Sequence, residues 1–317
     1  MSRTSTIPLR LLGMALTILV GAFAVFMVMK TAPGDPALAV LGEQAPPEAV
    51  AAFHQRFHLD APVLEQFWWW FSAAVVGDFG RSLTIAGGTS ISALIASRLP
   101  NTLFIGAYAL TLAIAVSLIM GTIAALQRGR LADTLATSLA VLGISMPDFW
   151  LSYVLIFALA LGLGWFPSYG FIAPEQSLAG ALHSGFLPAL AISAPMAAVF
   201  ARTLRAALLE ISHREFVTVA RSFGFAEFFI FLHFVFRNAL IPYVTVIGLQ
   251  VRYLLGGVVV IERIFGIPGL GSLMVDGAFG RDYPVVEACA ITFLAIVLAV
   301  NLSVDLLCTA LDPRRSH

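Results

Sequence analysis

The chain has 317 residues, of which 59% are hydrophobic and 11% are charged, and its mean hydropathy is +0.92. Soluble domains carry about 25% charged residues. This composition therefore excludes an ordinary soluble enzyme and indicates an integral membrane protein. Eighteen basic and eighteen acidic residues give a net charge of zero, so the charge balance offers no support for nucleic-acid binding.

The basic residues also limit what the chain can do with nucleotides. All but one of them are arginines, and the single lysine, Lys30, follows Met29 in an apolar run. A phosphate-binding loop needs a Gly-Lys-Ser/Thr sequence, which this chain lacks. We expect no catalytic residue, no metal site and no cofactor in the chain.

Six long apolar stretches define the expected architecture. Each is longer than the ~20 residues that a helix needs to cross the hydrocarbon core, and none alternates as a membrane β-strand does. We therefore predict an all-α integral membrane protein with six transmembrane helices. The stretches lie near residues 9–29, 102–126, 134–161, 187–209, 239–261 and 285–309.

The basic residues set the expected orientation. If the N-terminus lies inside, eleven arginines fall inside and six basic residues fall outside, with Arg252 left within a span. Because positively charged loops tend to stay in the cytoplasm, both termini are predicted to be cytoplasmic. The resulting divisions are a first transmembrane helix at 1–30, an extracytoplasmic segment at 31–98, a five-helix core at 99–312 with a cytoplasmic loop at 210–238, and a cytoplasmic tail at 313–317.

The extracytoplasmic segment contains a run of five aromatic residues, Phe-Trp-Trp-Trp-Phe, at 67–71. Tryptophan favours the membrane–water interface. An amphipathic helix on the membrane surface is therefore favoured over a site that stacks a ligand.

The cytoplasmic loop at 210–238 predicts two short helices joined by a glycine. Ser212 can cap the first helix, with Glu215 three residues later completing a capping box. Gly224 can end that helix in a left-handed turn, and a second helical run follows at 226–238. Helix physics alone leaves two interpretations equal: a helix on the membrane surface, or a docking element for another protein.

The same loop carries a family resemblance. Residues 215–224, Glu-Phe-Val-Thr-Val-Ala-Arg-Ser-Phe-Gly, together with 237–242, resemble the "EAA" loop of binding-protein-dependent ABC importer permeases. More narrowly, the chain is similar to the first permease subunit of the dipeptide/oligopeptide/nickel branch. The resemblance covers nearly the whole chain, with further motifs in order at 32–36, 77–82, 98–102, 145–150, 262–271, 281–286 and 311–314.

This resemblance implies a transport subunit of a bacterial-type inner membrane that forms half of a pathway for di- and oligopeptides or a related solute such as a nickel chelate. The implied partners are a second, homologous permease subunit, cytoplasmic ABC ATPase subunits and an extracytoplasmic solute-binding protein. The ATPase is expected to grip the helix of the coupling loop. The candidate coupling residues are Glu215, Thr218, Val219, Ala220, Arg221 and Gly224.

The loop departs from the family pattern in two places. Thr218 stands where the family has an acidic residue, and the run at 228–234 is rich in phenylalanine where arginine is usual. The second departure is compatible with a more apolar docking surface or with a helix that lies deeper in the interface.

Polar residues within the spans are candidates for the solute pathway, because an unpaired charge near a helix centre costs about 2.5–3.5 kcal/mol. Arg252 lies near the middle of its span and is expected to line the pathway or to pair with an acid. Asp148 follows Pro147, where a kink favours a structural role over a contact with solute. The pathway candidates are Asp148, Gln250 and Arg252.

Other polar residues lie towards the ends of the spans. Glu287 lies close to the outer rim, where we expect it to be solvated. Candidate contacts for the solute-binding protein are Arg263, Arg281 and Asp282, for which a simple position among lipid headgroups is the competing interpretation.

Two other classes of protein fit the sequence less well. The first is an intramembrane enzyme such as a zinc protease: His54 and His58 have the spacing of its metal-binding motif, but Gln55 replaces the glutamate that the motif needs. An ion-coupled secondary carrier is the alternative function, and it is expected to show internal repeats, of which we find no convincing example. Uptake that requires a partner ATPase and survives an uncoupler would distinguish the importer from the carrier.

Overall fold

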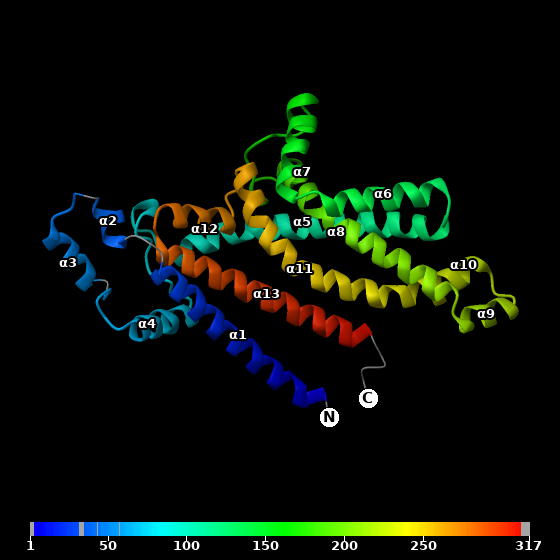
Figure 1. Ribbon diagram of the computed structural model, residues 1–317, viewed down its shortest axis with the longest axis horizontal. Coiled ribbons are helices and arrows are strands. Elements are labelled where there is room, and N and C mark those ends of the chain that lie inside the picture. The colour runs from blue at the N-terminus through cyan, green and yellow to red at the C-terminus, as the bar shows by residue number, and fades with distance from the viewer. Residues whose placement is uncertain (1–2, 32–34, 43, 57, 312–317) are drawn as a thin grey trace. The chain divides into compact units, whose positions relative to one another are not determined.

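The computed structural model describes residues 3–31, 35–42, 44–56 and 58–311. These residues are mainly helical, and one isolated bridge, between Arg81 and Ser90, is the only strand-like pairing among them. The predicted all-α class is confirmed. Figure 1 labels the α-helices: α1 (Arg3–Thr31), α2 (Pro36–Leu41), α3 (Pro47–Arg56), α4 (Val63–Val75), α5 (Ile91–Leu126), α6 (Leu131–Ser145), α7 (Asp148–Leu155), α8 (Leu178–Ser212), α9 (Glu215–Ser222), α10 (Glu227–Ile230), α11 (Arg237–Phe265), α12 (Leu270–Phe279) and α13 (Tyr283–Leu311).

Within the described residues, five helical segments are long and apolar enough to cross a membrane, and each of two bent helix pairs adds one if it forms a single span. The first bent pair, α6 with the helix at 148–162, turns by 109°. Proline explains this break, because Pro147 pushes the preceding Met146 into an extended conformation, with φ −93° and ψ 125°. Counting this pair as one span gives the six predicted spans.

The second bent pair was not predicted. The end of α11 and α12 form it, with an angle of 79° between them. Gly266 ends α11 in a left-handed conformation, with φ +65°. The sequence interpretation treated this region as a loop, whereas the structure has a ten-residue helix there.

The chain divides into two compact units, and each is built from separate parts of the sequence. The first unit combines Met1–Thr102 with Pro268–Leu298. One of its core clusters packs the start of α5 against α12 and the start of α13, through Ile91, Leu270 and Val285. Because the two parts share a core, a linear division of the sequence does not reproduce this unit.

The aromatic run of the first unit forms helix α4. Phe67 is 3% exposed and packs against Phe26 of α1, with ring centroids 5.6 Å apart. Trp68 and Trp69 are 55% and 51% exposed. The run is therefore a helix with one buried and one open aromatic face, as the amphipathic interpretation requires.

The second unit combines Leu103–Ile267 with Ala299–His317. Helix α8 is its central element, since 78% of its most apolar window is buried, and it packs against α6, α7 and α11. A buried hydrogen bond of 2.7 Å between the hydroxyls of Ser117 and Tyr243 links α5 to α11.

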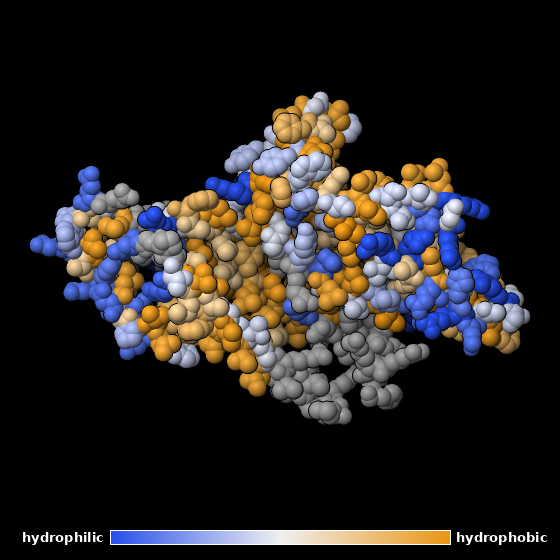
Figure 2. All heavy atoms as spheres, viewed as in Figure 1, coloured by the Kyte–Doolittle hydropathy of each residue, from blue (hydrophilic) through white to orange (hydrophobic). Residues whose placement is uncertain are grey.

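The surface differs between the long helices and the short ones. In Figure 2, hydrophilic side chains gather around α9 and around α2 and α3, whereas the long helices show mainly apolar side chains on the same face. Apolar outer faces are what a lipid environment requires. Helices α2, α3 and α9, by contrast, carry the polar surface that water or a protein partner can contact.

Candidate coupling site

Helix α9 is a separate short helix, as predicted, but the predicted cap is wrong. Arg214 stands at the N-cap and makes no side-chain capping bond. Ser212 instead ends α8, where its hydroxyl donates to the Leu208 carbonyl at 2.6 Å. Burial of Val217 and Ala220 therefore holds α9 in place.

The outward face of α9 carries both polar and apolar side chains. Val219 is 51% exposed, and Phe223, just beyond the helix end, is 77% exposed. Ala220 is only 5% exposed, so this one candidate packs inward. Exposed apolar groups on one short element are typical of a surface that contacts another protein. The coupling candidates that stand exposed are Glu215, Thr218, Val219, Arg221 and Gly224.

Gly224 forms the predicted left-handed turn, with φ +78°, and its amide donates to the Arg221 carbonyl at 2.9 Å. A Cβ atom added at Gly224 would meet no atom within 4 Å. The need for glycine is therefore a matter of backbone conformation alone. An ion pair that the sequence did not reveal bridges this turn, since the Arg221 Nε donates to Glu227 Oε1 at 2.9 Å.

The second predicted helix is not a separate element. Helix α10, a π-helical stretch at Phe231–Phe236 and α11 follow one another, and Phe231 and Arg237 keep right-handed helical angles where they meet. The phenylalanine-rich run is therefore the beginning of the fifth spanning helix. It buries Ile230 and Val235 and leaves Phe228 76% exposed.

A buried ion pair ties α6 to α8, the helix that leads into α9. The Arg205 Nε and Nη2 donate to the two Asp133 carboxylate oxygens at 2.7 and 2.8 Å. Asp133 also accepts from the Gly129 amide at 2.9 Å and is 6% exposed. No sequence motif marks this pair, because 72 residues separate its members.

Among the pathway candidates, Asp148 is the first residue of α7, at the break in the third span. A Cβ atom at Gly257 would lie 2.7 Å from the Asp148 Oδ2, so the glycine lets the carboxylate reach the α11 backbone. Gln250, on the same helix, is half-buried. The side chain of Arg252 lies outside the described residues.

Asp282, a docking candidate, is buried in the first unit with 0% exposure. Its Oδ2 accepts hydrogen bonds from the Ser82 hydroxyl at 2.6 Å and from the Leu83 and Thr84 amides at 2.8 and 2.9 Å. The carboxylate therefore organises the loop before α5 and presents no surface to a partner. Arg263 and Arg281, the other two docking candidates, are exposed.

Glu287 is 5% exposed, so the expectation that it is solvated is wrong. It lies in the second turn of α13, and its main electrostatic interaction is with Lys30 at the end of α1. Packing between these two chain segments, which the sequence alone does not show, removes it from water.

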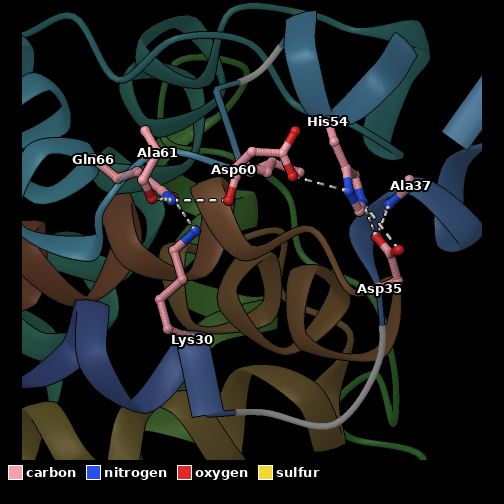
Figure 3. Close-up of polar contacts among 8 residues, drawn as sticks. Lys30, Asp35, Ala37, His54, Asp60, Ala61 and Gln66 are labelled. Atoms are coloured by element: carbon pink, nitrogen blue, oxygen red, sulfur yellow. Dashed lines mark hydrogen bonds and ion pairs between the residues drawn. The ribbon is translucent and has the colours of Figure 1, made fainter. Parts of the chain in front are cut away.

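A polar cluster joins α2 and α3 (Figure 3). The His54 Nε2 donates to the Asp35 carboxylate, with a distance of 2.9 Å to Oδ1, which also accepts from the Ala37 amide at 2.8 Å. The Asp60 carboxylate lies 3.7 Å from the His54 Nδ1. Burial by itself raises the pKa of the Asp35 carboxyl, but the hydrogen bonds from His54 and Ala37 outweigh it and bring that pKa below its ordinary value.

The fold defines the chain as a multi-pass helical membrane protein, and its sequence matches a known family. Residues 117–317 match the family described as "Binding-protein-dependent transport system inner membrane component", and residues 5–106 match the N-terminal part of such membrane components. The chain belongs to this family of inner membrane transport components.

Two relatives extend over nearly the whole chain. The glutathione transport system permease protein GsiC of Escherichia coli K12 is 38% identical over 304 residues, which is 96% of each chain. A putative peptide transport system permease protein of Brucella abortus is 38% identical over 296 residues, covering 93% of this chain and 94% of the relative.

Solved structures share the fold at low identity. A chain of the methionine ABC transporter MetNI in an inward-facing conformation aligns with a TM-score of 0.57 and 17% identity, covering 69% of this chain and 97% of its own. A chain of an amino acid ABC transporter with histidines gives a TM-score of 0.51 and 16% identity, covering 70% of this chain and 94% of its own.

The family confirms the prediction of an ABC importer permease, in which ATP hydrolysis belongs to a partner ATPase and a binding protein supplies the solute. The alternative of an ion-coupled carrier finds no support. The chain is a transport subunit of the inner membrane and not an enzyme.

Proposed function

We propose that this chain forms half of a membrane pathway for peptides, with a second, related permease subunit as the other half. Relatives that cover 93% and 96% of the chain carry peptide or glutathione transport in their names. These names favour peptides over nickel chelates as the solute. The sequence has no phosphate-binding loop, so we assign ATP hydrolysis to the partner ATPase.

Helix α9 is the contact for the ATPase. The observation that carries this assignment is its exposed face, with Val219 51% and Phe223 77% exposed on a helix anchored by Val217 and Ala220. The turn at Gly224 joins it to the continuous helix 227–265, so a displacement of α9 passes to the fifth span. Rigid-body motion of this kind is a common switching mechanism in proteins.

In this scheme both termini and α9 lie in the cytoplasm, as the excess of inside arginines indicates. The solute-binding protein then meets the extracytoplasmic side of the membrane, and its proposed contacts are Arg263 and Arg281, each of which is exposed within its own unit. Asp148, Gln250 and Arg252 are the proposed polar contributors to the pathway.

The test is a pair of matched substitutions in the importer reconstituted with its ATPase and binding protein. Val219→Asp places a charge in the proposed contact, and Val76→Asp places one at a valine that is 81% exposed in the first unit. Burying an uncompensated charge costs more than the ~1.5 kcal/mol gained by burying valine. We therefore expect Val219→Asp to lower uptake and binding-protein-stimulated ATP hydrolysis at least tenfold.

The control Val76→Asp should leave both activities close to those of the wild type. Equal activities in the two variants, at equal amounts of protein in the membrane, would remove α9 from the ATPase contact.

A further inference from the structure

A cavity of about 270 Å³ opens in the first unit, at the end of α1, beside α4 and the start of α13. One water molecule needs only about 10–15 Å³, so the cavity has room for a small organic group. Its walls are mainly aromatic and aliphatic, and they include Phe26, Met29, Phe53, Trp69, Trp70 and Leu83.

A lysine and a glutamate line the same cavity. Lys30 donates a hydrogen bond to Gln66 (Figure 3), and its ammonium lies 5.3 Å from the centre of the Phe26 ring. An ammonium has three donors, so this geometry leaves donors for a further acceptor. Glu287 lines the cavity at 5% exposure, and within the described residues its carboxylate interacts with Lys30 without a hydrogen bond.

Trp70, which lines the cavity, also carries an unmet donor within the wall. The buried indole Nε1–H of Trp70 has no hydrogen-bond partner among the described residues. Buried donors and carboxylates are stabilised when a partner is supplied. A carboxylate and an ammonium that share a largely apolar cavity are complementary to a molecule that carries an ammonium and an anionic group together.

The position of the cavity indicates where such a molecule comes from. Lys30 stands in the last turn of α1 and Glu287 in the second turn of α13, so the cavity lies where two membrane-crossing helices end. Trp68 and Trp69 are exposed on the neighbouring α4. Tryptophan at helix ends is typical of the headgroup layer, where a phospholipid can enter.

We propose that this cavity binds the head group of a phosphoethanolamine phospholipid, with its phosphate at Lys30 and its ammonium at Glu287. The phosphate accepts from the lysine, and the primary ammonium donates to the carboxylate. A choline head group cannot make the second contact, because its quaternary ammonium has no donor, and a glycerol head group lacks the positive charge. The site therefore selects phosphatidylethanolamine.

The test measures lipid retention on the intact importer by native mass spectrometry, after exchange into detergent with phosphatidylethanolamine, phosphatidylcholine or phosphatidylglycerol. The wild type should retain phosphatidylethanolamine about tenfold better than the other two, the effect of one charged hydrogen bond. Glu287→Gln should lower this retention about tenfold. Glu65→Gln, at an exposed acid of α4 that does not line the cavity, should leave it unchanged.

A second variant acts by volume rather than charge. Leu83→Trp fills the cavity and should lower retention of phosphatidylethanolamine while keeping both charges. If the wild type retains the three lipids equally, the proposal is overturned. It is also overturned if both Glu287→Gln and Leu83→Trp retain phosphatidylethanolamine as well as the wild type does.

The remaining outcome is that the cavity binds a soluble molecule that carries an ammonium and an anionic group, in place of a lipid head group. Saturable binding of free phosphoethanolamine or a dipeptide in lipid-free detergent, lost in Glu287→Gln, would assign the cavity to a soluble zwitterion and overturn the lipid assignment. These measurements do not use transport. A chain that imports peptides but shows no lipid selectivity therefore refutes this proposal and leaves the proposed function intact.

Discussion

Substitutions at Gly224 test whether backbone geometry or side-chain contact governs coupling. The residue has φ +78°, and a Cβ atom there meets nothing within 4 Å. The penalty for another residue is therefore the left-handed conformation itself, about 1–2 kcal/mol, and it is smaller for asparagine. A penalty of this size changes an equilibrium by roughly 5- to 30-fold.

We expect ATP-driven uptake to fall in the order glycine, asparagine, alanine, valine, with alanine lower than glycine by up to about 30-fold. The assay is solute uptake into vesicles that contain the permease subunits, the ATPase and the binding protein, corrected for the amount of permease in the membrane. Gly77→Ala is the matched control, because Gly77 has φ +82° and equally open surroundings in the first unit. It should leave coupling unchanged.

Asparagine has a larger side chain than alanine but tolerates the left-handed region better. If Gly224→Asn impairs uptake more than Gly224→Ala does, side-chain volume at a partner surface governs coupling and the reasoning from backbone geometry fails.

Three further outcomes are expected. Asp133→Asn weakens the two charged hydrogen bonds with Arg205 and should lower the melting temperature of the purified importer; an unchanged melting temperature would contradict this. Asp282→Ala removes the acceptor of the buried Ser82 hydroxyl and of the part-buried Leu83 and Thr84 amides, and it should make residues 82–85 sensitive to protease, whereas Asp78→Ala, at an exposed turn, should not. The lowered pKa of Asp35 means that its contribution to stability is present above the unfolded-state pKa of about 4 and is lost as the pH falls through the folded-state pKa, so hydrogen-exchange protection in α2 and α3, relative to the intrinsic exchange rate at each pH, should fall below about pH 4 in the wild type and show no such step in Asp35→Asn.

Features that depend on a single residue or a long uniform run were predictable from the sequence. The spans follow from apolar length, the break at Pro147 from the missing amide and the restricted residue before it, and the turn at Gly224 from the freedom of glycine. Each of these signals acts within one or two helical turns. No distant contact has to be known to interpret them.

Features that depend on competition or on distant packing were not predictable. The Ser212 hydroxyl donates to the Leu208 carbonyl, four residues earlier, in place of the predicted cap. From the sequence, Asp282 and Glu287 were expected to lie at the outer membrane surface. In the structure both are buried, against residues from the N-terminal third of the chain. Helix α12 was not predicted for a similar reason, because a helix this short is stabilised mainly by packing against residues that are distant in the sequence.

The bond between the Ser82 hydroxyl and the Asp282 carboxylate spans 200 residues of chain. A ribosome adds about 5–20 residues per second, so the carboxylate emerges roughly 10–40 s after the loop that it organises. During synthesis the first unit therefore stays incomplete while residues 103–267 of the second unit are made. Throughout this delay the N-terminal part of the first unit lacks both the carboxylate that organises its loop and the α13 residues that complete its core.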